Sequence, residues 1–281
     1  MFEFKYDEKS QAEKIINEGF SSNHLTGELK VLAKYFKYLG QKPKEREESL
    51  YEVCKKHLAD FNKVSYFRRI NAALNYAKKK DSELIVVESA PVHKSELDYI
   101  DSLDISHYYK KVVFTLLILS RLGKQVQEIR DASKVNSEYF FGGNQRNYQE
   151  LKLSSKTPQQ SKRNKIKGVH DIIGDLDKEG IVEIRGRGYI RLSFAYSLLP
   201  DKIAFEVTTF DDIGHYYDLH TGENKIKKCE ECGKLIKSNS NKTKYCTECA
   251  KRNKHKKIAE INKKNREKKR KTKSDYKIEN L

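Results

Sequence analysis

Four of the five cysteines form two pairs near the C-terminal end of the sequence. The chain reads Cys229-Glu-Glu-Cys232-Gly and, after twelve more residues, Cys246-Thr-Glu-Cys249. Two pairs with this spacing can place four thiolates at the corners of a tetrahedron around Zn²⁺. We therefore expect one zinc ion per chain, and a complete set of four protein ligands implies a structural role. Metal binding also explains the cysteines better than disulfides do, which favours a reducing, cytoplasmic location.

The residues around the two pairs resemble those of a zinc ribbon or a treble-clef finger. Gly233 follows the first pair, where a tight turn needs a residue that tolerates positive φ. A helix is expected after the second pair, which Tyr245 precedes. In the treble clef the second pair lies at the start of a helix, whose N-terminal dipole favours thiolates. The rival interpretation, two redox-active pairs, lacks the expected βαβ pattern.

The positive charge of the chain is concentrated around and beyond these cysteines. The 281 residues carry a formal net charge of +17. Residues 224–281 hold 21 Lys/Arg against 7 Asp/Glu, and the rest of the chain holds 36 against 33. A cationic block of this kind binds polyanions by releasing their counterions, which favours nucleic acid as the partner. The predicted contacts in this segment are Lys251, Arg252, Lys254, Lys256 and Lys257. The alternative is a solubilising or disordered tail.

The fold class expected is mainly α with small β elements, in several domains. Residues 8–80 have helical spacing of apolar residues, and one stripe contains Leu29, Leu32, Ala33, Phe36 and Leu39. Cys54 falls on another such stripe and is expected to be a core residue. The predicted domains are a helical domain over 1–100, a middle domain over 101–222 and the zinc module over 223–281.

The middle segment begins with an apolar helix over Tyr108–Leu122, which Gly123 is expected to end. A short second helix over Gln125–Ala132 and a long insertion, roughly 134–156, follow. A third helix is expected from Thr157 to Gly180, with one apolar face. Its outer side and flank carry Arg163, Asn164, Lys167, His170 and Asp171.

An alternating apolar pattern over 181–194 then predicts a hairpin, interrupted by Arg185-Gly186-Arg187-Gly188. A helix, a glycine stop and a basic-tipped hairpin in this order resemble the third helix and wing of winged helix-turn-helix proteins, over about 105–195. The resemblance implies that the third helix enters the major groove and that the wing contacts the DNA backbone or minor groove. The contacts it implies are Arg163, Asn164, Lys167, Arg185 and Arg187.

No catalytic motif accompanies these features. The sequence has no G-x-x-x-x-G-K-[ST], no H-E-x-x-H and no G-x-G-x-x-G that opens a helix, so we expect no enzyme. A finger nuclease would need two histidines at the finger, and only His255 lies nearby. The longest apolar run, Val112–Leu119, is shorter than the roughly 20 residues of a membrane span, so no membrane partner is expected.

The sequence thus favours a duplex-binding regulator of transcription or an initiator of replication, with RNA as another possible ligand. The alternative is a phage or mobile-element inhibitor that binds a host nucleic-acid-dependent defence complex, a protein or ribonucleoprotein. A zinc-finger nuclease is the third hypothesis. The oligomeric state stays open.

Overall fold

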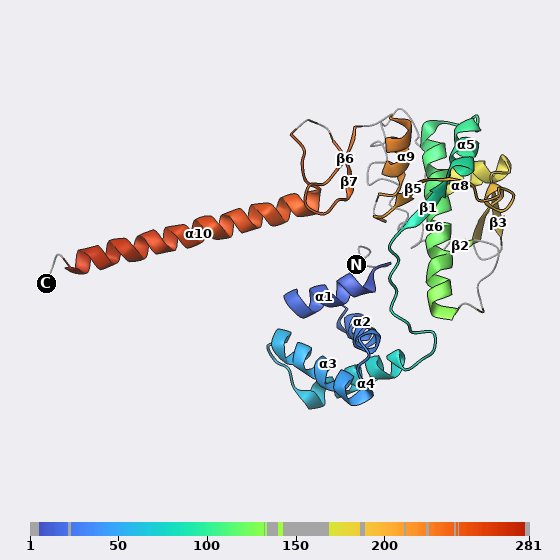
Figure 1. The fold of residues 1–281 in the computed structure, drawn as a ribbon. Helices are drawn as coiled ribbons and strands as arrows, with labels where there is room; N and C mark the ends of the chain where they lie inside the picture. The colour runs from blue at the N-terminus through green and yellow to red at the C-terminus, as the bar shows by residue number, and fades with distance from the viewer. Residues whose placement is uncertain are drawn as a thin grey trace. The chain divides into compact units, whose positions relative to one another are not determined.

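Figure 1 shows the computed structural model of the chain. It describes residues 6–21, 24–131, 133, 140–142, 169–185, 189–210, 212–222, 225–238, 240 and 242–278. The chain divides into two compact units, Met1–Gly214 and His215–Leu281. The described residues are mainly helical with small antiparallel sheets, which confirms the expected mainly α class with small β elements.

The first four helices pack around one apolar core (Figure 1). Their bounds are α1 Glu8–Glu18, α2 Leu25–Tyr38, α3 Pro43–His57 and α4 Lys63–Ala77. The core contains Leu29, Leu32 and Phe36 of the predicted stripe, together with Cys54. Leu39 is 54% exposed, so its assignment to that stripe was wrong. The reason is that α2 ends at Tyr38, and Gly40 turns the chain with φ of 80°.

A two-stranded antiparallel sheet joins distant parts of the first unit. Strand β1 (Ala90–His93) pairs with β5 (Ile203–Val207), and α5 (Lys94–Ser102) follows β1 directly. This pairing joins the end of the predicted first domain to the predicted second one. The segment 83–87 forms an isolated bridge between Val86 and Asp7.

The central helix α6 runs without a break from His107 to Asp131 (Figure 1). The predicted stop at Gly123 and the separate helix from Gln125 are therefore wrong. Glycine in a helix interior costs only about 1 kcal/mol. The helix buries Phe114, Leu117 and Leu122 before this glycine, and that packing outweighs the local preference.

A three-stranded antiparallel sheet follows, in the order β2-β4-β3. Strand β2 (Phe140–Gly142) lies within the segment predicted as an insertion, and β3 (Val182–Arg185) and β4 (Tyr189–Leu192) form the predicted hairpin. Helix α8 (Val169–Lys178) precedes the hairpin, and Gly180 with φ of 68° permits the turn between them. A single 3-10 turn, Phe194–Tyr196, follows β4.

The C-terminal part contains α9 (Gly214–Thr221), a hairpin of β6 (Ile226–Lys228) and β7 (Leu235–Lys237), and α10 (Thr247–Ile278). Helix α10 is one continuous helix of 32 residues. Within the ranges given above, no helix combines the length and the apolarity that crossing a membrane requires.

Candidate metal centre and basic helix

The first cysteine pair lies on the turn between β6 and β7. The Cys229 N–H donates to the Lys234 carbonyl at 2.8 Å, and the Gly233 N–H donates to the Cys229 carbonyl at 2.9 Å. Gly233 has φ of 71°, the left-handed conformation expected of it. The hairpin therefore fixes the backbone that carries Cys229 and Cys232.

The second pair lies at the start of α10, as the treble-clef resemblance implied. Cys246 immediately precedes the helix, and its carbonyl accepts the Ala250 N–H at 2.9 Å. Cys249 lies in the first turn. A bond of 3.0 Å from the Glu230 N–H to the Lys244 carbonyl connects the loops that carry the two pairs. The β6–β7 hairpin and the start of α10 thus bring the two cysteine pairs together.

The four sulfur atoms lie within 4.8 Å of one another. The Sγ atoms of Cys232 and Cys246 are 3.8 Å apart. In a tetrahedral Zn–S₄ centre with bonds of about 2.3 Å, adjacent sulfurs are about 3.8 Å apart. The donor set and its spacing therefore fit one zinc ion, with Cys229, Cys232, Cys246 and Cys249 as its ligands.

Backbone N–H groups point to sulfur atoms of the cluster, and they lower the pKa of one of the thiols. The Cys246 N–H points to the Cys229 sulfur at 3.3 Å, and the Cys249 N–H to the Cys246 sulfur at 3.4 Å. Burial raises the pKa of Cys229, but N–H donors from Cys246, Cys232 and Glu231 more than offset it, so that this pKa falls to about 6. Burial and neighbouring thiols raise the pKa of Cys249 instead. Zinc binding would release the remaining thiol protons.

Arg252 connects the metal centre to the basic helix. Its Nη2 donates to the Cys249 sulfur at 3.2 Å and lies 3.1 Å from Oε1 of Glu231. The Asn253 side chain donates to the other oxygen of Glu231 at 2.9 Å. Arg252 is one of the five cations predicted to contact nucleic acid here, but its side chain instead contacts the metal-ligand sulfur of Cys249. Such outer partners orient metal ligands and tune their basicity.

Helix α10 carries 14 Lys/Arg against 4 Asp/Glu. Lys251, Lys254, Lys256 and Lys257 are all exposed. Ile258 and Ile261 are also solvent-exposed, at 44% and 56%. The part of α10 next to the metal centre thus presents a cationic surface to solvent over its first three turns.

The predicted reading helix and wing are only partly described. Arg163, Asn164, Lys167 and Arg187 lie outside the described residues. Arg185 is exposed, but its Nε pairs with Glu183 Oε1 at 2.9 Å. Of the predicted contacts of this segment, the described residues include Arg185 alone.

The described part of α8 and the turn after it expose more acidic than basic side chains. Asp171, Asp177 and Glu179 are exposed beside a single cation, Lys178. This acidic surface does not favour contact with phosphates. The cationic surface next to the zinc centre is the better candidate.

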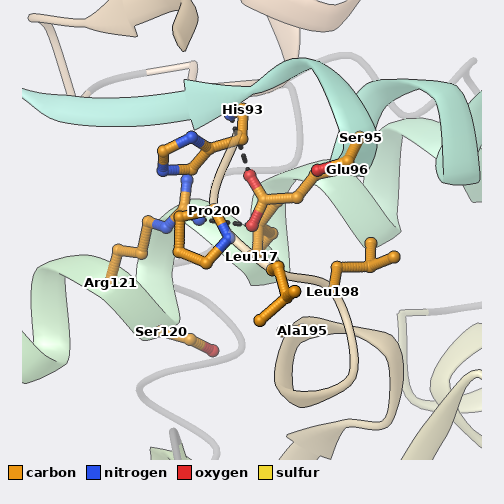
Figure 2. Close-up of a pocket in the computed structure, with 10 residues that line it drawn as sticks. His93, Ser95, Glu96, Leu117, Ser120, Arg121, Ala195, Leu198 and Pro200 are labelled. Atoms are coloured by element: carbon orange, nitrogen blue, oxygen red, sulfur yellow. Dashed lines mark hydrogen bonds and ion pairs between the residues drawn. The ribbon is translucent and has the colours of Figure 1, made fainter. Parts of the chain in front are cut away.

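A small cavity of about 70 Å³ lies between α5, α6 and the segment 195–200 (Figure 2). The buried carboxylate of Glu96 accepts the His93 N–H at 2.9 Å and pairs with Arg121, which also donates to the Pro91 carbonyl. Because protein groups satisfy both charges, the pair is structural and joins β1, α5 and α6. Sequence reasoning missed it, although Glu96 stands three residues after His93, the position of a capping glutamate.

Among the described residues, the four cysteines are the only group of three or more ligand side chains close enough to share a metal. His215 pairs with Asp218 at 3.2 Å, and no third ligand side chain of the described residues joins them. The chain matches no model of a known protein family, no curated protein and no solved structure.

Proposed function

We propose that the protein is a zinc-stabilised nucleic-acid-binding protein without catalytic activity, and that α10 is its principal contact to duplex DNA. One observation carries this proposal: a strongly basic helix begins within a cluster of four cysteines that fits zinc. The first turn of the helix contains Cys249, and the exposed lysines follow in the next two turns. A folded metal centre would hold these lysines on a defined scaffold.

The charge of the zinc centre leaves the segment strongly basic. Four thiolates and one divalent ion carry −2 together. Residues 224–281 carry 21 Lys/Arg against 7 Asp/Glu, so the segment retains about +12 with zinc bound. Such a surface supplies affinity that does not depend on base sequence.

The order of α8, the turn at Gly180 and the hairpin β3–β4 supports a winged-helix arrangement in the middle segment. The described part of α8 exposes more acidic than basic side chains, so we assign phosphate binding to α10 rather than to this part of the middle segment. Such a protein would act in the regulation of transcription or in the initiation of replication.

The test is the salt dependence of duplex binding by the full chain with zinc bound. The triple variant Lys254→Gln, Lys256→Gln and Lys257→Gln removes three exposed charges from α10. If each lysine neutralises one phosphate, the slope of log K against log salt becomes shallower by about 2.7. Fluorescence anisotropy with a labelled duplex between 50 and 200 mM salt would measure the two slopes, a range over which such binding changes steeply.

The matched control removes three exposed lysines of the other compact unit, Lys55, Lys80 and Lys94. This control changes net charge equally, so an equal loss of slope would contradict a defined contact on α10. Absence of duplex binding at low salt would overturn the proposal. Binding to a protein or ribonucleoprotein alone would favour the inhibitor hypothesis, and metal-dependent cleavage would favour the nuclease.

A further inference from the structure

A groove on the N-terminal helices has a chemistry that the zinc centre and α10 do not use. It lies between the first turns of α3 and one face of α4, and has a volume of about 220 Å³. A single ordered water needs roughly 10–15 Å³, so the groove has room for a much larger group. Its lining combines three cations, Lys44, Arg46 and Lys78, with the aromatic ring of Phe67.

Arg46 is the unusual member of this lining. It is only 9% exposed, and its Nε has no hydrogen-bond partner among the described residues. No carboxylate of the described chain pairs with its guanidinium within 4.0 Å. Burial of a charge without a partner is costly, and arginine pairs best with a planar carboxylate or with a phosphate. The side chain therefore has the properties of one half of an anion site.

The surroundings of Arg46 reinforce its preference for an anion. Pro43 occupies the first position of α3, so the groove lies at the positive end of a 15-residue helix. Lys44 and Lys78 are exposed at its rim. Glu47 is the one acidic residue in the lining, so cations outnumber it three to one.

Phe67 adds an aromatic face to the lining of this groove. Its side chain is 52% exposed although it lines a concave surface. An aromatic face beside a cationic groove is the arrangement with which proteins bind nucleotides of single strands, by stacking a base and pairing the phosphate. A simple inorganic anion would leave this ring in water.

We propose that this groove binds one nucleotide unit, with the phosphate on Arg46 and the α3 N-terminus and the base on Phe67. The unit is either a free nucleotide or a residue of a single strand. This inference goes beyond the proposed function, because the groove lies in the first compact unit and requires neither zinc nor α10.

The test uses the full zinc-bound chain and three ligands: uridine monophosphate, inorganic phosphate and a short oligouridylate. Isothermal titration measures affinity, and photo-crosslinking of 5-iodouridine monophosphate followed by peptide mass spectrometry locates the base. The variants are Arg46→Met, which keeps most of the buried stem, and Phe67→Ala, which alters an exposed ring. The control, Arg69→Met, removes an exposed arginine that stacks on Tyr66 instead.

We expect uridine monophosphate to bind more tightly than phosphate and to crosslink to the peptide with Phe67. Arg46→Met should weaken binding about tenfold or more, and Phe67→Ala at least about fivefold. Arg69→Met should change little. A mononucleotide that binds as tightly as the oligouridylate identifies a free nucleotide as the ligand. A tighter oligouridylate whose affinity falls in Phe67→Ala identifies a strand, because binding through α10 would not respond to that variant.

Absence of saturable uridine monophosphate binding would overturn the inference, as would a crosslink outside α3 and α4. Equal affinity for phosphate and uridine monophosphate, with no effect of Phe67→Ala, would also overturn it. Because Phe67→Ala does not disturb the core, misfolding of Arg46→Met would still leave a decisive variant. Duplex binding through α10 should be unchanged by either variant, so failure of the two proposals can be distinguished.

Discussion

Replacement of Cys232 by serine should release the zinc ion and unfold the module around it. Cys232 is the exposed member of the cluster, whereas Cys229, Cys246 and Cys249 are buried. The substitution therefore removes a ligand with the least direct effect on packing. A hydroxyl is a much poorer zinc ligand than a thiolate, so the variant should no longer hold the zinc ion.

The size of the effect follows from how little else holds this module together. Among its described residues, the core consists of Cys229, Cys246 and Cys249 with Ile236 packed against them, and Leu235 is buried nearby. Full burial of one leucine contributes roughly 1.5–3 kcal/mol. A structural zinc site contributes roughly 10–16 kcal/mol at pH 7. Zinc thus contributes more to the stability of the module than the apolar contacts do. Without zinc, those contacts should not be enough to keep the module folded.

Two measurements on the purified chain check this prediction. Metal analysis should give one zinc per chain for the wild type and none for Cys232→Ser. Hydrogen exchange should show loss of protection at the N–H groups of Cys229, Glu230 and Ser238, which are hydrogen-bonded in the folded module. Exchange in α2 to α4 should stay the same.

Cys54→Ala is the matched control, because Cys54 is fully buried in the N-terminal core and far from the cluster in sequence. It should keep one zinc per chain. Retention of zinc by Cys232→Ser would refute the assignment of the ligands. Loss of zinc with unchanged exchange would refute the claim that the metal stabilises the module.

Three further predictions concern the support of the site and the core. Arg252→Met should lower zinc affinity by about 10- to 100-fold, because it removes the bond to a ligand sulfur; Lys251→Met should not, and chelator competition would compare them. Arg121→Met should lower the free energy of unfolding by about 3–5 kcal/mol, because it leaves the Glu96 carboxylate buried without its partner; a double variant with Glu96→Leu should recover most of this loss in urea unfolding. Burial raises the pKa of Cys54 to about 11, so ionisation favours the unfolded chain as pH rises from about 9 to 11; unfolding free energy should fall over this range in the wild type but less in Cys54→Ala.

The parts of the site that the sequence predicted well depend on short spacings. Two residues separate each cysteine pair, and the turn at Gly233 and the helix after Cys246 are local features. These local features shape the backbone around each pair, and the hydrogen bond that brings the two pairs together spans only 17 residues. The helices of the N-terminal core follow for the same reason, because the period of their apolar residues shows which face is buried.

The features that the sequence did not predict depend on distant residues. Strand β1 exists because Ala90–His93 meets Ile203–Val207, more than a hundred positions away. The α6 helix continues past Gly123 because burial of its apolar face outweighs the preference of one residue. The Glu96–Arg121 pair likewise needs two helices to be in contact. Local propensity carries no information about such pairings.

The position of Cys246 and Cys249 also determines how α10 forms. The equilibrium constant for forming the first turn of an α-helix carries an unfavourable factor of roughly 10⁻³, whereas extending the helix by one more residue costs little free energy. A zinc ion bound at the first turn would supply that start, and the helix would extend from it for about 48 Å. Repulsion among its basic residues opposes this extension. Helicity should therefore decay with distance from the ion, and a chelator should melt many more residues than those that surround the metal.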